Sequence, residues 1–128
     1  MTSQTLTLRS FRNLRAYRRA AALASDIFWI TRRFPRDGQN TLSDQMRRHA
    51  HAIPDAIARG WHQRHDPCAF TQDLDAALNA CYQLSHWLNV AKACQYLSAD
   101  EHHALMARKK ELHRTIAQLR ARCGMLCE

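Results

Sequence analysis

The feature that most constrains this chain is an apolar stripe that keeps its helical phase across a proline. Between residues 42 and 61, apolar side chains follow one another at steps of 4, 4, 3, 4 and 4 residues, which is the spacing of one buried helix face. The stripe consists of Leu42, Met46, Ala50, Ile53, Ile57 and Trp61. Pro54 lies inside it, and an interior proline removes a hydrogen bond to the preceding turn. Because the phase is kept, the pattern predicts one helix kinked at Pro54.

Helical spacing also fills most of the remaining chain. A length of 128 residues with 46% hydrophobic content suits one domain with a single core. Only three glycines and three prolines interrupt it, which favours helices over a sheet with many turns. Further helices are predicted from Ser10 to Pro35, from Asp66 to about Gln95, and from Ser98 to Gly124.

Short connections between long helices imply antiparallel neighbours. The predicted fold class is therefore all-α, an antiparallel up-and-down four-helix bundle with a proline-kinked second helix. We expect a single domain over residues 1–128, in which residues 1–9 form a flexible N-terminal segment.

Apolar seams and caps support these boundaries. The first helix is predicted to bury Leu14, Tyr17, Ala21, Ala24 and Phe28, with Leu23, Ile27, Ile30 and Phe34 beside them. The third helix carries the seam Phe70, Leu74, Ala77, Cys81, Leu84, Leu88 and Ala91. Predicted helix starts are an N-cap at Ser10, one at Thr41 or Ser43, the pair Asp66-Pro67, and a capping box from Ser98 to Glu101.

The compartment is predicted from what the sequence does not contain. The N-terminus has no apolar core of signal-peptide length, and no apolar run approaches the roughly 20 residues that span a bilayer. We therefore expect a cytoplasmic protein without membrane contact. In that compartment cysteines are normally reduced. Free thiols are expected at all five positions, Cys68, Cys81, Cys94, Cys123 and Cys127.

Positive charge is confined to the first half of the chain. Residues 1–64 carry twelve arginines, no lysine and four aspartates, which leaves +8, whereas residues 65–128 carry seven basic and seven acidic side chains. One interpretation is that the arginines are ordinary surface residues on solvent-exposed helix faces. The other is an anionic partner, with the phosphates of RNA or DNA first.

The candidate nucleic-acid-binding residues lie on the first two predicted helices. They are Arg12, Arg15, Arg19, Arg47, Arg48, Arg59, Arg64 and Trp61. Trp61 lies between two of these arginines and could stack on a base, as could Trp29 and Trp87. The alternative for Trp61 is a place in the core or at a subunit interface.

Catalytic and metal sites are weakly indicated. His62, His65 and Cys68 have a spacing that resembles metal ligands, but a fourth ligand is missing and basic neighbours would repel a cation, so surface histidines at a helix end are the favoured explanation. Cys81 falls on an apolar helix face, where thiols are normally inert. We therefore expect no enzyme activity, no metal and no cofactor.

The residues already described resemble a known family. The segment "SFRNLRAY" (Ser10–Tyr17), the Phe34-Pro35 helix end, "LSDQMRRHAHAIPDAIARG" (Leu42–Gly60) and "YLS" (Tyr96–Ser98) are similar to the four-helix-bundle family of 23S ribosomal RNA intervening-sequence proteins. That family is related to accessory proteins of diversity-generating retroelements. The similarity covers residues 10 to about 100, and the segment around Pro54 is its most specific part.

The resemblance implies a small bacterial bundle that assembles into a homo-oligomer, often a pentameric ring. In the retroelement branch, basic bundles of this kind work with a reverse transcriptase and nucleic acid. Together with the charge distribution, this predicts a homo-oligomer that binds RNA, DNA or a nucleoprotein. The alternative is a protein-protein interaction scaffold with no nucleic-acid binding, whose arginines serve solubility or subunit contacts.

Overall fold

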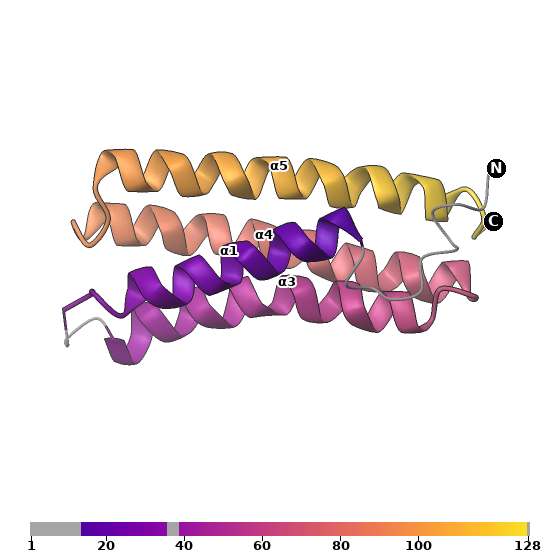
Figure 1. Cartoon of the computed structure of the whole chain (residues 1–128), viewed down its shortest axis with the longest axis horizontal. Coiled ribbons are helices and arrows are strands. Elements are labelled where there is room, and N and C mark those ends of the chain that lie inside the picture. The colour runs from indigo at the N-terminus through magenta and orange to yellow at the C-terminus, as the bar shows by residue number, and fades with distance from the viewer. Residues whose placement is uncertain (1–13, 36–38, 128) are drawn as a thin grey trace.

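Four long helices form an antiparallel bundle, as predicted. The computed structural model describes residues 14–35 and 39–127, and these contain helices and turns but no strand. The helices are α1 (Arg15–Thr31), α3 (Asp44–His62), α4 (Pro67–Ala93) and α5 (Ala99–Gly124), with a π-helical turn, η3 (Gln39–Ser43), leading into α3. In Figure 1 they lie side by side with alternating direction, and the start of α1 lies near the end of α5. None of the described helices is long and apolar enough to cross a bilayer.

The seams predicted for α3 and α4 form the core. Every member of the stripe from Leu42 in η3 to Trp61 in α3 is at most 5% exposed, and the seven predicted seam residues of α4 are at most 1% exposed. Helix α3 runs without a break through Pro54, which is itself buried. Interior proline costs a helix about 3 kcal/mol, so the buried side chains on both sides of it must offset that cost. The prediction of one helix is confirmed.

The buried face of α1 differs from the prediction. Phe28, assigned to its main seam, is 42% exposed. The predicted residues Leu14, Leu23, Ala24, Ile27 and Phe34 are buried, but the prediction missed Ala16, Ala20 and Thr31, which are buried as well. Thr31 tolerates full burial because its hydroxyl donates to the carbonyls of Ile27 and Phe28, at 2.8 and 2.9 Å. Alanine and threonine carry little apolar weight, so a count of large apolar residues does not detect these buried positions.

Two predicted caps are confirmed, and the one at Ser43 is not. The Asp66 side chain accepts from the amide of Ala69 with proline at the first helical position, and the capping box from Ser98 to Glu101 is complete. By contrast, Ser43 makes no capping hydrogen bond because η3 already continues into α3. Helix α1 begins after the extended residue Leu14, so the predicted helix does not extend unbroken from Ser10. It also ends at Thr31, before Pro35; Ser10 itself and residues 1–9 lie outside the described residues.

The expectation of five reduced cysteines is wrong for two of them. Cys68, at the start of α4, and Cys127, after the end of α5, form a disulfide across a sequence separation of 59 residues. Their spacing along the chain gave no hint of it, because only the antiparallel packing brings these two helix ends together. Cys81, Cys94 and Cys123 remain free thiols.

Gly60 lies in close contact with α4, and its replacement by alanine is expected to destabilise the fold. A Cβ at this position would lie 2.8 Å from Cδ1 of Phe70 and 3.0 Å from Cβ of Asp73. Alanine gains about 1 kcal/mol of helix propensity, but overpacking costs about 1–3 kcal/mol. We expect a net loss of roughly 1 kcal/mol in the free energy of unfolding, measured by urea denaturation.

The matched control for this prediction is Gly124→Ala. There the added Cβ meets only the flexible guanidinium end of Arg120, at 3.3 Å. This variant is expected to be neutral or slightly stabilised. Equal effects at the two glycines would contradict the close packing inferred at Gly60.

Candidate nucleic-acid interface

Some of the predicted arginines are paired with an acidic side chain from another helix. Arg19 on α1 donates to a carboxylate oxygen of Glu111 at 3.3 Å and to the hydroxyl of Thr115 at 2.8 Å. Arg59 on α3 donates to Asp73 at 2.8 Å. In both cases the acid comes from the second half of the chain, so the two halves partly cancel across helix contacts. These arginines hold helices together, which leaves them less available to a partner.

Two other predicted arginines lie over aromatic rings. Arg47 is half-buried, donates from Nε to the hydroxyl of Thr31 at 2.7 Å, and places its guanidinium 5.0 Å from the centroid of Phe28. Arg64 lies 4.5 Å from the ring centroid of Trp61 and donates to its backbone carbonyl at 3.1 Å. Neither charge is cancelled by a carboxylate within the described residues.

Exposed arginines without an acidic partner remain on three helices. Arg15 and Arg48, both predicted, are exposed and form no ion pair among the residues that the structure describes. The same holds for Arg18 on α1 and for Arg122 on α5, which the list of candidates omitted. Arg12 lies outside the described residues. Burial, followed by the nearby charges of Arg48 and His86, lowers the pKa of His49, so this imidazole adds little positive charge near neutral pH.

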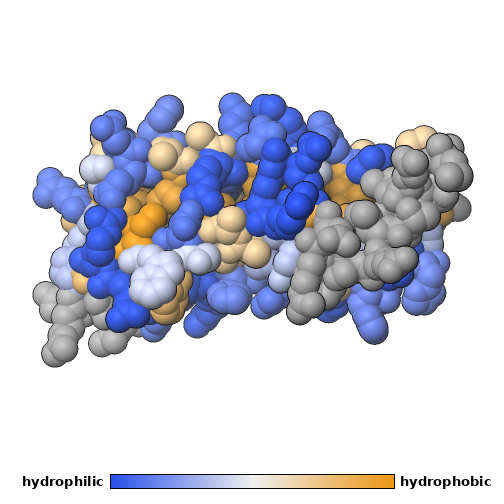
Figure 2. Space-filling view, viewed as in Figure 1, coloured by the Kyte–Doolittle hydropathy of each residue, from blue (hydrophilic) through white to orange (hydrophobic). Residues whose placement is uncertain are grey.

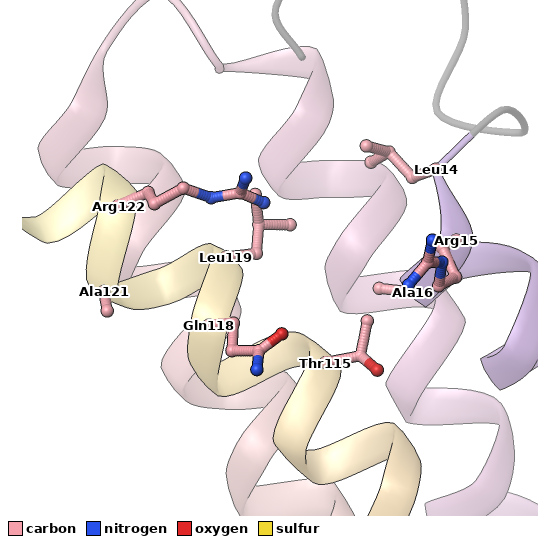
Figure 3. A pocket seen from close by; sticks show the side chains of 8 residues that line it. All are labelled: Leu14, Arg15, Ala16, Thr115, Gln118, Leu119, Ala121 and Arg122. Carbon is pink, nitrogen blue, oxygen red and sulfur yellow. The ribbon is translucent and has the colours of Figure 1, made fainter.

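A hollow of about 580 Å³ between α1 and α5 lies beside part of this arginine set. It is lined by Leu14, Arg15, Ala16, Thr115, Gln118, Leu119, Ala121 and Arg122. Figure 3 shows Arg15 and Arg122 on opposite sides of it, with Gln118 and Thr115 on the α5 side between them. The lining contains no carboxylate. Guanidinium groups and neutral donors arranged this way suit a phosphate group.

Trp61 belongs to the core. It is 3% exposed and packs edge-on against Phe70, with ring centroids 6.2 Å apart. Of the two roles open from the sequence, the structure supports packing, and no ring face is open to a base. Trp87 is half-buried, whereas Trp29 is 60% exposed.

Trp29 belongs to a cluster that we call the aromatic–arginine patch, formed by Phe28, Trp29, Arg32 and Arg47. Arg32 lies 5.3 Å from the ring centroid of Trp29 and 6.0 Å from that of Phe28. The two rings meet edge to face at 5.4 Å. Figure 2 shows hydrophilic side chains over the middle of α1 and a hydrophobic area beside its C-terminal half. Sequence reasoning missed the patch because it assigned Phe28 to the core.

The surroundings of Cys68 and Cys81 do not favour a metal ligand or a nucleophile at either position. Cys68 is held in the disulfide, so its sulfur is no thiolate ligand. No group of three or more metal-binding side chains comes together within residues 14–35 and 39–127. Burial raises the pKa of the Cys81 thiol to about 12, which keeps it protonated and unreactive near neutral pH.

Comparisons with known proteins agree with this architecture. A sequence model of the 23S rRNA-intervening sequence protein family matches residues 12–118. The fold is similar to the crystal structure of a protein with unknown function from the S23 ribosomal protein family of Bacteroides thetaiotaomicron, with a TM-score of 0.73 and 15% identity. That match covers 83% of this chain and 95% of the other, and at this identity it supports the fold alone. A search of curated proteins gives no significant match.

Proposed function

The chain belongs to the 23S rRNA-intervening sequence protein family, and from this premise we propose a non-enzymatic, homo-oligomeric bundle that binds RNA, DNA or a nucleoprotein. The binding surface consists of arginines on α1 and α3. One observation carries the proposal: Arg15, Arg18 and Arg48 stay exposed and unpaired in the described structure, although other arginines of the same helices are paired with acids.

Unpaired surface arginines favour a polyanion over a protein scaffold. An arginine that neutralises a phosphate displaces counterions condensed on the nucleic acid. The release of those ions raises entropy, so affinity falls steeply as salt is added. Arg15 has Arg122 across the hollow from it, which gives two cationic groups for one anionic strand. No acid of the lining opposes them. A chain that used these arginines only as internal ion pairs would have paired them with its own carboxylates.

We expect a homo-oligomer because the family resemblance implies one, with a pentameric ring as the expected form. In a ring, each protomer presents the same arginine surface. Contacts made by several protomers to one strand then add through high effective concentration, without any new contact type. Weak binding by a single bundle would thereby become tight binding by the assembly.

The sharpest test reverses the unpaired charges. We expect Arg15→Glu and Arg48→Glu each to weaken binding of a mixed-sequence oligonucleotide by about tenfold at low salt. Each should also reduce the slope of log affinity against log salt by about 1, because one phosphate contact is lost. Fluorescence anisotropy at several salt concentrations measures both quantities.

Lys110→Glu is the matched control, since Lys110 is an exposed cation on α5 outside the proposed surface. It makes the same change in net charge and should alter affinity by less than about threefold. If all three variants weaken binding equally, only overall charge matters and the proposed surface is wrong. If wild-type protein binds no oligonucleotide at low salt, the protein-scaffold alternative replaces the proposal.

A further inference from the structure

The aromatic–arginine patch exposes large rings where a soluble bundle normally places polar groups. Trp29 is 60% and Phe28 is 42% exposed, on the part of α1 just before it ends at Thr31. Both rings have a guanidinium within 6.0 Å of their centroids. Arg32 and Arg47 therefore hold positive charge against the rings, and the patch itself contains no carboxylate.

This combination matches the chemistry of an unpaired nucleotide. Every base has a flat π face that stacks on an exposed aromatic ring, while the adjoining phosphate needs a cation nearby. In a duplex the bases are stacked on each other and cannot reach a protein ring without being flipped out. A ring beside unpaired arginines thus selects single strands over duplexes.

We propose that the aromatic–arginine patch stacks an unpaired base of single-stranded RNA or DNA on Trp29, while Arg32 and Arg47 face the neighbouring phosphates. The inference rests on the proposed nucleic-acid binding and adds the form of the ligand. Phe28 meets Trp29 edge to face and so fixes the orientation of the indole. Arg47 is in turn positioned by its hydrogen bond to Thr31.

Charges around the patch favour one path for the strand. Asp26, one turn earlier on α1, is paired with Arg108 of α5 at 2.6 Å and so adds little repulsion. Arg48 follows Arg47 on α3 and is exposed. A hollow of about 330 Å³ beside Phe28 continues between α1 and α3, but its lining includes Asp55. Phosphates are therefore expected over the arginines, and this hollow is expected to stay free of them.

The test compares nucleic acids in which the bases are unpaired, missing at one position, or paired in a duplex. Binding of a single-stranded oligothymidylate, the same strand with one abasic site at its centre, and a duplex of equal length is measured for wild type and Trp29→Ala. We expect Trp29→Ala to bind the intact single strand about tenfold more weakly and the duplex about as well as wild type. The salt slope should not change, because no phosphate contact is removed. Trp29→Phe should recover most of the affinity because it keeps a ring.

Each other outcome overturns the inference. Tyr82→Ala is the control variant, since Tyr82 is 75% exposed on α4 and lies outside the patch; an equal loss there would make stacking at Trp29 unspecific. Equal single-strand affinity for wild type and Trp29→Ala would refute the stacking site while leaving the arginine surface intact. A fall in oligomer mass in Trp29→Ala would mean that a second copy of the chain covers the patch. Absence of any nucleic-acid binding by wild type would overturn both proposals.

Discussion

Phe70→Ala is expected to lower the free energy of unfolding by about 3–5 kcal/mol. Phe70 is 1% exposed, lies against Gly60 of α3, and packs edge-on against Trp61. Alanine would remove the buried ring and leave a cavity that rigid helix backbones cannot fill. A loss of this size is a large share of the 5–15 kcal/mol that stabilises an ordinary domain. Urea denaturation followed by circular dichroism measures it.

Tyr82→Ala is the control for this prediction. It removes a larger aromatic side chain from the same helix, but at a position that is 75% exposed. Its expected effect is within about 0.5 kcal/mol. If the two variants are equally stable, the face of α4 taken here as the core is not the buried one.

Reduction of the disulfide is expected to cost about 4 kcal/mol of stability. The bond between Cys68 and Cys127 closes a loop with a sequence separation of 59 residues, and a loop of that length restricts the unfolded chain by this amount in the chain-entropy treatment. Oxidised protein should show three reactive thiols after unfolding and reduced protein five. The midpoint of urea denaturation should fall when a reductant is added.

Serine variants separate the bridge from a general effect of reductant. Cys68→Ser and Cys127→Ser should each match the reduced wild type and respond no further to reductant. Cys94→Ser removes an exposed free thiol and should behave as wild type in both buffers. Five reactive thiols in protein kept without reductant would mean that the bridge does not form in solution.

Periodicity predicted the bundle because its strongest seams are made of large apolar residues. The α3 stripe and the α4 seam each bury side chains at nearly every predicted position, and Pro54 did not break the first of them. Helix starts were predictable where a side chain caps its own backbone within three residues, as Asp66 and Ser98 do. These signals are local, so a sequence contains them in full.

Features that depend on distant residues were not predictable. The face of α1 was only partly predicted because Ala16, Ala20 and Thr31 carry little apolar weight, although all three are buried. The disulfide arises from two helix ends that meet only in the folded chain.

The sequence likewise predicted some features of the candidate site and not others. Sequence placed an excess of arginine on the first two helices, and this excess is the basis of the proposed function. It could not predict that Arg19 forms an ion pair with Glu111 and Arg59 with Asp73, because those acids lie 92 and 14 residues away along the chain. It could not distinguish buried Trp61 from exposed Trp29 either, since both tryptophans belong to helices rich in arginine.

The most direct test of the account is the mass of the purified protein by light scattering, with and without a single-stranded oligonucleotide, at low and moderate salt. The account predicts a defined homo-oligomer, with a pentamer expected, that gains the mass of bound nucleic acid at low salt. Moderate salt should release that mass without dissociating the oligomer, because counterion competition acts on phosphate contacts. A mass that does not change with the oligonucleotide at either salt concentration would contradict the central claim.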